Sequence, residues 1–393
     1  MSEAAVHVFP ERTATPELVL TGARLVLDDE VVVGSLRIAD GLIQSVDQGR
    51  SSLPAAIDLD GDWLIPGLID LHTDNLEKHY QPRIGVQWDP VHAAISHDVQ
   101  VIGSGITTVF DSITIGAAEG WDARSDWVEP MLQGLDEARE HDMLKAEHRL
   151  HLRAEVTHEQ ILEIFEHHAT RRRVSFVSLM DHAPGDRQSP DVEDYRQRCL
   201  KQFGDPAAVE HHIERLLHAS AQLAPGHRLR LGEVATAWRI PLATHDDASA
   251  AHVEEAVALG AVLSEFPTTA EAAAAARQHG LHVLMGSPNL IRGGSHSGNV
   301  AAGDLARAGL LDILSSDYIP ASLILGAFRL AGEAFGWPLP DVIATVTRIP
   351  AEAAGLDDRG SIRAGLLADL VRVRGVGERP VVRTVWRAGA RVA

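Results

Sequence analysis

The middle of the chain alternates short apolar runs, rich in β-branched residues, with longer amphipathic stretches. Runs bounded by turn residues are typical of strands, and the segments 131–147, 205–224 and 269–279 have helical periodicity. Repeated strand–helix units predict parallel strands joined by right-handed crossovers. The strand candidates are 64–74, 106–112, 148–156, 174–182, 241–247, 261–267, 282–289 and 313–320.

About eight such units fit a (β/α)₈ barrel, so the predicted fold class is α/β with a TIM-like barrel. A doubly wound open sheet is the competing architecture. No GxGxxG or GxxxxGK(S/T) turn follows the first strand candidate. This absence counts against an open sheet that binds nucleotides.

The two ends of the chain have a different pattern. Residues 17–60 read as short strands separated by Gly and Asp, and the segment from about residue 360 has the same texture. A two-stranded piece alone is only marginally stable, so the ends are expected to pair in one small β-sandwich. The predicted domains are a sandwich made of 1–62 and 356–393, and a barrel at 63–355.

Nearly every strand candidate ends with polar, mostly ionisable residues. In a parallel barrel these strand ends converge at the C-terminal face, where the active sites of such barrels lie. Carboxylates are common in loops, but their recurrence at successive strand ends favours a shared site. The residues concerned are His72, Asp74, Asp111, Glu155, Asp181, His182, His245, Asp246, Asp247, Glu265 and Asp317.

The chemistry of this set predicts a metal centre. Imidazole and carboxylate ligands suit zinc, manganese, iron and nickel, and the single cysteine, Cys199, excludes a cysteine-based site. Alternate side chains of a strand point the same way, so His72 and Asp74 are expected to face one ion. A polar rim held by salt bridges is the alternative. The predicted ligands of one or two divalent ions, with zinc favoured, are His72, Asp74, Glu155, His182, His245 and Asp317.

Such a centre predicts hydrolysis. A bound divalent ion lowers the pKa of water towards about 7 and polarises a phosphoryl or carbonyl oxygen. Asp317, at the last strand, is the predicted catalytic residue. Its carboxylate can take a proton from water and deliver it to a leaving group.

Composition and charge limit the partners. The 393 residues include 35 Lys and Arg against 55 Asp and Glu, a net charge of −20, which opposes binding to nucleic acid or an anionic membrane. No apolar run approaches the roughly 20 residues that cross a bilayer. The N-terminal segment lacks a basic stretch followed by an apolar core, so no signal peptide is expected. With one cysteine, the expected location is the reducing cytoplasm.

Four sequence blocks occur in the order known from one family. They are PGLIDLHTD at 66–74, GITTVFD at 105–111, SSDYIP at 315–320 and TRIPAEAAGLDDRGSIRAGLLADLVRV at 347–373. These blocks resemble the amidohydrolase superfamily. The resemblance implies a metal-dependent hydrolase with a barrel and a terminal sandwich.

Two features depart from the general pattern of that family. The second ligand of the first-strand signature is Asp74 instead of histidine. Many members bridge two metals with a carboxylated lysine, but the only lysines here, Lys78, Lys145 and Lys201, end no middle strand. Glu155, which closes HLRAE, is the better bridging candidate, and the number of metal ions stays open.

Further segments narrow the resemblance. HTDNLEKHYQPR at 72–83, SLMDHAPGDRQ at 178–188 and GSPNLIRGGSHSGNVAA at 286–302 are similar to the branch that acts in phosphonate catabolism. This branch implies hydrolysis of a sugar 5-triphosphate to the 5-phosphate and pyrophosphate. The alternatives are an amidohydrolase that cleaves a cyclic amide or N-acyl bond, and an inactive scaffold.

A triphosphate substrate requires local cations, because the overall charge of the protein repels it. Arginine binds phosphate through a bidentate fork, and the Gly-Ser loop after the seventh strand lies where barrels often bind phosphate. The alternative for this loop is a flexible connector with a helix cap at Ser297 or Asn299. The predicted substrate-binding residues are Lys78, His79, Arg83, Arg187, Arg292, Gly294, Ser295, His296 and Ser297. The expected partner is a small phosphorylated sugar, and the family resemblance favours a homodimer.

Overall fold

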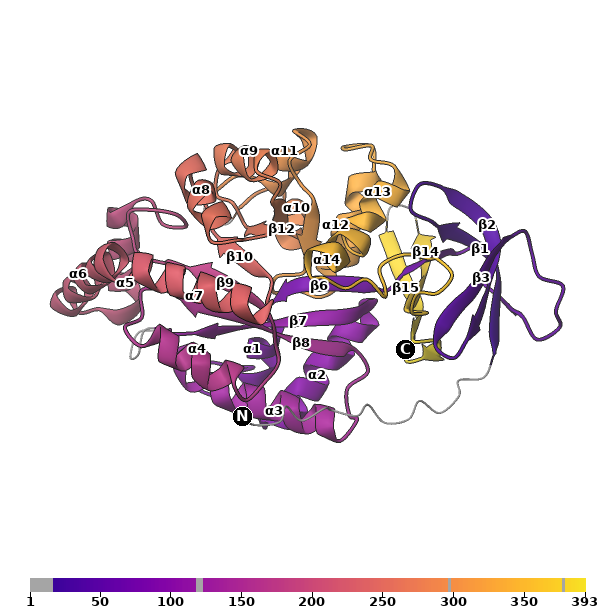
Figure 1. Ribbon diagram of the computed structural model, residues 1–393, viewed down its shortest axis with the longest axis horizontal. Helices are drawn as coiled ribbons and strands as arrows, with labels where there is room; N and C mark the ends of the chain where they lie inside the picture. Colours follow the sequence, from indigo (N-terminus) through magenta and orange to yellow (C-terminus); the bar gives the residue numbers. More distant parts are fainter. Residues whose placement is uncertain (1–16, 118–122, 296–297, 377–378) are drawn as a thin grey trace.

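The computed structural model describes residues 17–117, 123–295, 298–376 and 379–393. Within these ranges a parallel barrel lies beside a second sheet built from both ends of the chain (Figure 1). Successive barrel strands pair in parallel, which confirms the predicted fold class. These strands are β6 (Leu68–Thr73), β7 (Ile106–Ile115), β8 (Glu147–Glu155), β9 (Val174–Met180), β10 (Leu242–His245), β11 (Leu263–Glu265), β12 (His282–Gly286) and β13 (Ile313–Ser315).

The barrel closes between its first and last strands through the backbone of Asp317. The Asp317 amide donates to the carbonyl of His72 at 3.0 Å, and the Asp74 amide donates to the carbonyl of Asp317, also at 3.0 Å. Thr73 and Asp317 form the corresponding parallel bridge. Closure therefore brings the end of β6 directly beside the residue that follows β13.

Helices cover the outside of the barrel (Figure 1). Several begin at an aspartate that caps the free amides of the first turn, as Asp89 does for α2 and Asp205 for α6. The helices are α1 (Asn75–Tyr80), α2 (Pro90–Gly103), α3 (Val128–Glu140), α4 (Ile161–Ala169), α5 (Val192–Phe203), α6 (Pro206–Gln222), α7 (Ala224–Trp238), α8 (Ala250–Ala258), α9 (Ala270–Gln278), α10 (Ser287–Arg292), α11 (Ala302–Arg307), α12 (Ser322–Ala331), α13 (Leu339–Ala344) and α14 (Arg348–Ala353), with a short 3₁₀ turn at Ala123–Asp126.

The helix expected at 131–147 differs from α3. The helix begins earlier, at Val128, and ends at Glu140. Residues from Glu147 onward pair with β7 as strand β8, so they are not available to a helix. The hydrophobic periodicity predicted that a helix forms here, and the pairing of β8 with β7 limits where the helix can end.

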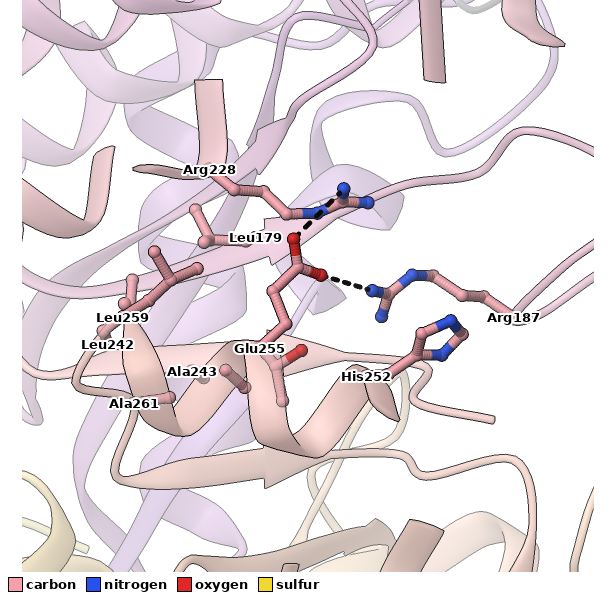
Figure 2. Close-up of a pocket in the computed structure, with 11 residues that line it drawn as sticks. Leu179, Arg187, Arg228, Leu242, Ala243, His252, Glu255, Leu259 and Ala261 are labelled. Carbon is pink, nitrogen blue, oxygen red and sulfur yellow. Dashed lines mark ion pairs between the residues drawn. The ribbon is translucent and has the colours of Figure 1, made fainter. Parts of the chain in front are cut away.

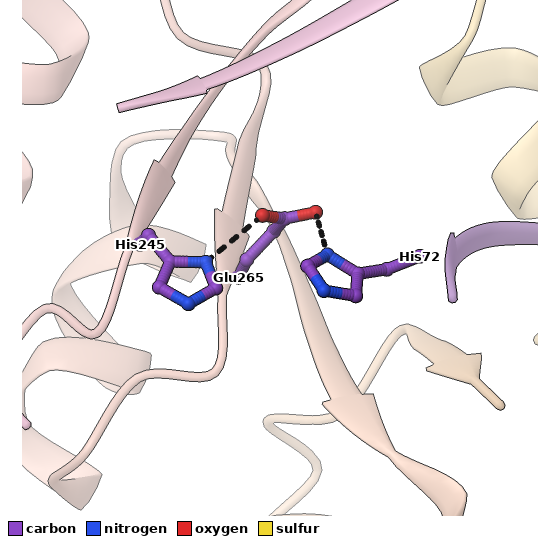
Figure 3. Close-up of side chains that lie close together, drawn as sticks. All are labelled: His72, His245 and Glu265. Atoms are coloured by element: carbon purple, nitrogen blue, oxygen red, sulfur yellow. Dashed lines mark hydrogen bonds and ion pairs between the residues drawn. The ribbon is translucent and has the colours of Figure 1, made fainter. Parts of the chain in front are cut away.

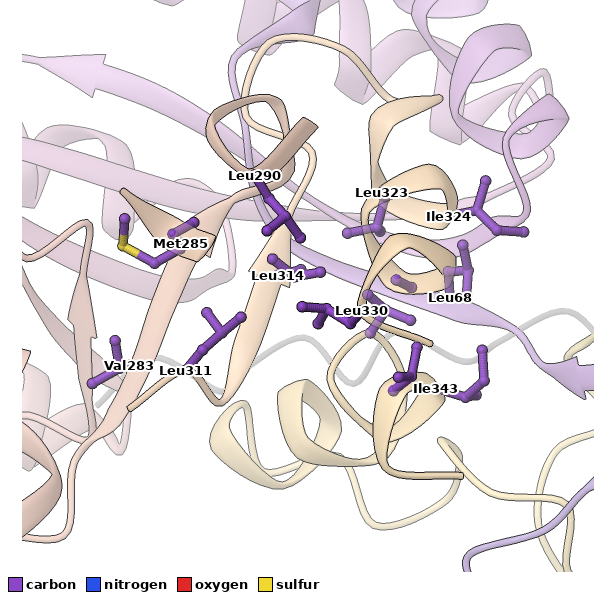
Figure 4. Close-up of a cluster of buried hydrophobic side chains, with 14 of the residues drawn as sticks. Leu68, Val283, Met285, Leu290, Leu311, Leu314, Leu323, Ile324, Leu330 and Ile343 are labelled. Carbon is purple, nitrogen blue, oxygen red and sulfur yellow. The ribbon is translucent and has the colours of Figure 1, made fainter. Parts of the chain in front are cut away.

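The two faces of the barrel wall have different roles. In β8, Leu150, Leu152 and Ala154 pack outward into one apolar cluster with residues of α3, α4 and α7. A second outer cluster joins β6, β12 and β13 to α10, α12 and α13 (Figure 4). Inside the barrel an apolar floor lies beneath the polar strand ends. The strand residues of this floor are Ile69, Leu71, Phe110, Phe176, Ala243, Leu263, Leu284 and Ile313.

The second sheet combines both ends of the chain, as their texture predicted. Its order is β16-β15-β14-β5-β1-β2-β3, with β4 paired to β1, and its core includes Leu36, Leu64 and Trp386. Strand β5 belongs to this sheet, and the barrel begins after it at Leu68. The strands are β1 (Leu18–Val26), β2 (Val31–Ala39), β3 (Leu42–Gln48), β4 (Ile57–Asp58), β5 (Trp63–Pro66), β14 (Leu370–Val376), β15 (Arg379–Arg387) and β16 (Ala390–Arg391).

Candidate metal centre

Three side chains from three different strands meet at the C-terminal end of the barrel. His72 comes from β6, His245 ends β10, and Glu265 ends β11. The Glu265 carboxylate lies between the two imidazoles, 3.1 Å from each Nδ1 atom (Figure 3). Possible ligand atoms of the three residues all lie within 4.8 Å of one another.

The Glu265 carboxylate orients both imidazoles through their Nδ1 atoms. Burial opposes ionisation of Glu265, but the neighbouring His72 and His151 outweigh it and hold the pKa of Glu265 well below its usual value. Burial also lowers the pKa of His72, which favours the neutral ring. An ionised carboxylate only accepts, so each imidazole donates its Nδ1–H. The Nε2 lone pairs of His72 and His245 are thereby left for a metal ion.

A supporting layer holds this group from below. The Ser178 hydroxyl lies 2.5 Å from both Glu265 Oε2 and His151 Nε2. His151 Nδ1 donates to the carbonyl of Leu71 at 2.9 Å, and burial lowers the pKa of His151 to about 3. This neutral, hydrogen-bonded ring links the apolar floor to the polar group above it.

A second group lies beside the first and shares His245 with it. His182, two residues after β9, donates from Nδ1 to Glu155 Oε2 at 2.7 Å. Its Nε2 lies 3.8 Å from Asp246 Oδ2, and His245 Nε2 lies 3.6 Å from the same oxygen. Burial lowers the pKa of His182, but the charges of Glu155 and Asp246 outweigh it and raise that pKa overall.

Asp317 joins this cluster from the closing side of the barrel. Burial and repulsion from Asp74 and Asp70 raise the pKa of the Asp317 carboxyl to about 7, against the opposing charges of Arg153 and Lys78. A Cβ atom on Gly286 would lie 3.1 Å from Asp317 Oδ2, so glycine at that position leaves room for the carboxylate. Asp317 can therefore hold or release a proton near neutral pH.

Asp74 reaches the cluster in a different way from the one expected. Strand β6 ends at Thr73, and Asp74 has left the strand to precede α1. The alternation of strand side chains therefore does not align Asp74 with His72. Its Oδ1 is nevertheless buried without a hydrogen-bond partner, and its charge acts on Asp317.

The donor set fits a divalent cation. Imidazole and carboxylate side chains converge, no cysteine takes part, and the buried oxygens Asp74 Oδ1 and Asp246 Oδ2 have no hydrogen-bond partner. Buried carboxylates that repel one another need a positive charge to balance them. Of the six predicted ligands, His72, His182 and His245 lie in these two groups and Glu155 contacts His182. The backbone hydrogen bonds of Asp317 to His72 and Asp74 place the other two beside them, and Glu265 and Asp246 are added to the predicted set.

Among the predicted substrate-binding cations, Lys78 lies nearest to the cluster. It is exposed on α1, donates from Nζ to the carbonyl of Tyr318, and lies 4.8 Å from the centre of the Tyr318 ring. His79 is half-buried, with its ring 6.2 Å from that of His97 on α2. Arg83 is exposed in the following loop, where it forms a backbone bridge with Val86.

Arg187 is neutralised within the protein. It is 5% exposed, and its Nη1 lies 2.9 Å from Asp247 Oδ1. Arg187 and Arg228 both point at Glu255 on α8, at 3.7 and 3.8 Å (Figure 2). The structure therefore gives no support to a phosphate-binding role for Arg187.

The Gly-Ser loop begins at the end of α10. Arg292 is exposed at the last position of this helix, and Gly294 donates its amide to the carbonyl of Asn289 at 3.0 Å. Ser295 is half-buried. His296 and Ser297 lie outside the described residues. Within the described ranges, no hydrogen bond or ion pair connects Arg292 to the metal-ligand cluster.

A separate polar network lies outside the barrel wall, between β7, β8 and α2. Asp111 lies inside β7 and accepts from His97 at 2.8 Å and from His148 at 2.9 Å, and His148 also contacts Asp98 at 3.2 Å. Burial lowers the pKa of His148, but Asp111 and Asp98 outweigh it and raise that pKa to about 9. These hydrogen bonds indicate a structural ion-pair network.

Replacing His148 with glutamine is expected to destabilise the fold by about 3–5 kcal/mol, because Asp111 keeps its buried charge without its strongest partner. His148 binds its proton more tightly in the folded state. In the parent protein the stabilisation is therefore complete below pH 6.5 and is lost as the pH rises through about 9. Denaturant unfolding at pH 6 and pH 9 tests both points. A variant with the parent stability and the parent pH dependence contradicts this interpretation.

Replacing Glu265 with glutamine is expected to weaken metal binding by about 10–100-fold, since an amide cannot accept from both imidazoles. Competition with a chelator of known affinity measures the change. The control is Glu233→Gln, which removes an exposed carboxylate on α7 that pairs with Arg230. Equal metal affinity in the Glu265 variant and the parent contradicts the anchoring role.

The family follows from comparison of the sequence. A sequence model of the amidohydrolase family matches residues 63–392, so the chain belongs to this family. The chain is also 46% identical, over 378 residues, to alpha-D-ribose 1-methylphosphonate 5-triphosphate diphosphatase of Escherichia coli K12. That match covers 95% of this chain and 100% of the relative.

Solved structures agree with this fold. A 5-methylcytosine deaminase from Klebsiella pneumoniae aligns with a TM-score of 0.66 at 14% identity, covering 96% of this chain and 98% of that one. An N-acetylglucosamine-6-phosphate deacetylase from Pasteurella multocida aligns with a TM-score of 0.61 at 13% identity, covering 96% and 100%. At these identities the likeness concerns the architecture.

Proposed function

We propose that this chain hydrolyses the 5-triphosphate of alpha-D-ribose 1-methylphosphonate 5-triphosphate, giving the 5-phosphate and pyrophosphate, as a step of phosphonate catabolism. The observation that carries the proposal is 46% identity across the whole length of a relative with this activity. The cluster at the barrel mouth supports it, because its groups suit metal-assisted attack of water on phosphorus.

The metal ligands in this proposal are the six residues of the predicted set. Glu265 orients the imidazoles of His72 and His245, and Asp246 adds a carboxylate between His182 and His245. Zinc is favoured for this mixture of imidazoles and carboxylates, and manganese, iron and nickel are alternatives. One or two divalent ions, when bound, polarise the phosphoryl oxygens and lower the pKa of water.

Asp317 is the proposed proton carrier. Its carboxylate takes one proton from the attacking water as the new oxygen–phosphorus bond forms. Attack on the α phosphorus breaks its bond to the bridging oxygen, and Asp317 gives the proton to the pyrophosphate that leaves. Attack on the β phosphorus breaks the other bond of that oxygen, and Asp317 then gives the proton to the 5-phosphate that leaves. A carboxyl whose pKa is raised to about 7 by burial and by Asp74 suits both halves of this exchange.

The substrate is proposed to enter from the rim that Lys78 occupies. Lys78 lies next to Tyr318, one residue after the proton carrier, and offers an exposed positive charge to the phosphates. Asn75 is directed elsewhere, since its amide donates to His97 and Gln100 of α2. The hydrogen bonds of Asn75 thereby tie the start of α1 to α2.

The test is turnover of the triphosphate by purified, metal-loaded protein, followed by ³¹P NMR. The expected products are pyrophosphate and the 5-phosphate in equal amounts. Release of orthophosphate alone, or no turnover, contradicts the proposal. Hydrolysis of a cyclic amide or an N-acetyl sugar without triphosphate cleavage supports the alternative amidohydrolase activity.

The remaining partner assignments are part of the same proposal. The described part of the chain contains no helix both long and apolar enough to span a bilayer. The acidic net charge of −20 argues against a nucleic-acid partner. A homodimer and a cytoplasmic location, the latter favoured by the lone Cys199, complete the proposal.

A further inference from the structure

Arg153 lies on the inner face of β8, where its charge acts on members of the metal-ligand cluster. His151, Arg153 and Glu155 occupy alternate positions of the strand, so all three point into the barrel. His151 belongs to the layer below the cluster, and Glu155 contacts His182 at the rim. Arg153 stands between these two levels and is 8% exposed.

Among the described residues, this guanidinium differs from several other buried or half-buried arginines because no acid pairs with it. Arg187 and Arg359 are buried and contact Asp247 at 2.9 Å and Glu147 at 2.6 Å, and the half-buried Arg228 contacts Asp181 at 2.6 Å. Within the described ranges Arg153 forms no ion pair or hydrogen bond, and its Nε is buried without a partner. An unpaired buried charge is strongly disfavoured, so the site calls for an anion.

The position of the charge shows where that anion would lie. The positive charge of Arg153 acts on His72, His182 and Asp317, which come from three sides of the cluster. Cations bound by the nearby carboxylates would leave those carboxylates still less able to neutralise Arg153. The counter-charge must therefore come from a molecule that enters the barrel mouth.

We infer that the Arg153 guanidinium binds phosphoryl oxygens of the triphosphate inside the barrel mouth, an inference that rests on the proposed triphosphate hydrolysis. The planar fork of arginine matches two phosphoryl oxygens, and its charge opposes the negative charge that builds up on them. Arg153 is buried between His151 and Glu155, whereas Lys78 is exposed. Arg153 thus holds the inner phosphate and Lys78 the outer end of the chain of phosphates.

The test replaces Arg153 with methionine, which keeps the length and removes the charge. Pyrophosphate is the probe, and calorimetry measures its affinity for metal-loaded protein whose metal content is verified. The expected result is pyrophosphate binding weaker by roughly 10–100-fold and a kcat lower by about 10²–10³-fold. The melting temperature should stay the same or rise, because an unpaired buried charge is removed. Arg153→Lys should restore part of the affinity.

Arg149 provides a matched control on the same strand and face, at the opposite end of the barrel. It pairs with Glu147 at 2.6 Å, away from the strand ends. Arg149→Met should leave pyrophosphate affinity and kcat unchanged. Should Arg153→Met not fold, Arg153→Lys decides the question, since loss of the fork alone should still weaken pyrophosphate binding.

The outcomes separate this inference from the proposed function. Parent-like pyrophosphate affinity and kcat in the folded Arg153 variant overturn the inference and leave the diphosphatase proposal intact. A lower melting temperature with unchanged affinity also overturns it, because it shows a structural role. Absence of triphosphate turnover by the parent overturns the proposed function, and the pyrophosphate measurements then still show whether Arg153 binds phosphoryl oxygens.

Discussion

Replacing Asp317 with asparagine is expected to lower kcat by about 10²–10⁴-fold, because the amide cannot carry the proton from water to the leaving group. The fold should remain, since closure of the barrel uses the Asp317 amide and carbonyl and not its side chain. Asp317 also has a positive φ of 57°, a conformation that asparagine adopts readily. Steady-state kinetics at matched metal content, together with the melting temperature, measure the two effects separately.

The control for this prediction is Asp312→Asn, at the opposite end of the same barrel strand. Asp312 accepts from the amide of Val283 at 2.9 Å and pairs with Arg277. Loss of this pairing should lower the melting temperature and leave kcat close to the parent value. Near-parent kcat in the Asp317 variant shows that another group carries the proton, and unequal metal content shows that Asp317 acts mainly as a ligand.

The architecture was predictable because each barrel strand leaves two local marks. One mark is an apolar run, and the other is the polar residue at its end, as in LATH of β10 or LSE of β11. Parallel topology then requires these ends to meet on one side. This reasoning was sufficient to bring His72, His182, His245 and Asp317 together from positions far apart in the chain.

Pairing between distant residues was not predictable from the same marks. Arg187 follows the fourth barrel strand, as a phosphate ligand would, but Asp247, 60 residues later, neutralises it. Asp74 lies two residues after His72, but the strand ends between them. The ion pair of Arg187 and the end of strand β6 both depend on the folded structure, and the local sequence pattern predicts neither of them.

Two important residues had weak signals in the sequence. Glu265 ends a strand of only three residues, and its role emerges only when His72 and His245 approach it from either side. Arg153 stands in HLRAE, where alternation places it on the same face as Glu155. That alternation was the available signal, but an arginine inside a barrel strand also fits an ordinary salt bridge. The structure distinguishes the two possibilities, because Arg153 forms no ion pair among the described residues.

Replacing His245 with alanine is expected to abolish stable metal binding and to lower kcat/KM by at least about 10³-fold, equivalent to several kcal/mol of lost transition-state stabilisation. His245 is the residue that both metal-ligand groups share. Its loss leaves Glu265 with one imidazole and separates His182 from His72. Elemental analysis after dialysis measures the metal, and added zinc should raise the melting temperature of the parent but not that of the His245 variant.

His282→Ala is the matched control, because His282 begins β12 at the opposite end of the barrel from the cluster. It should retain the metal content of the parent and respond to zinc in the same way. The comparison of the two variants separates a role of His245 in holding the metal from a role in acting on the substrate. If the His245 variant keeps its metal but loses turnover, the ring acts on the substrate and the ion rests on the other imidazoles. If it keeps both, the convergence of the two groups on His245 has no role in holding the ion, and the metal centre must be sought among other side chains.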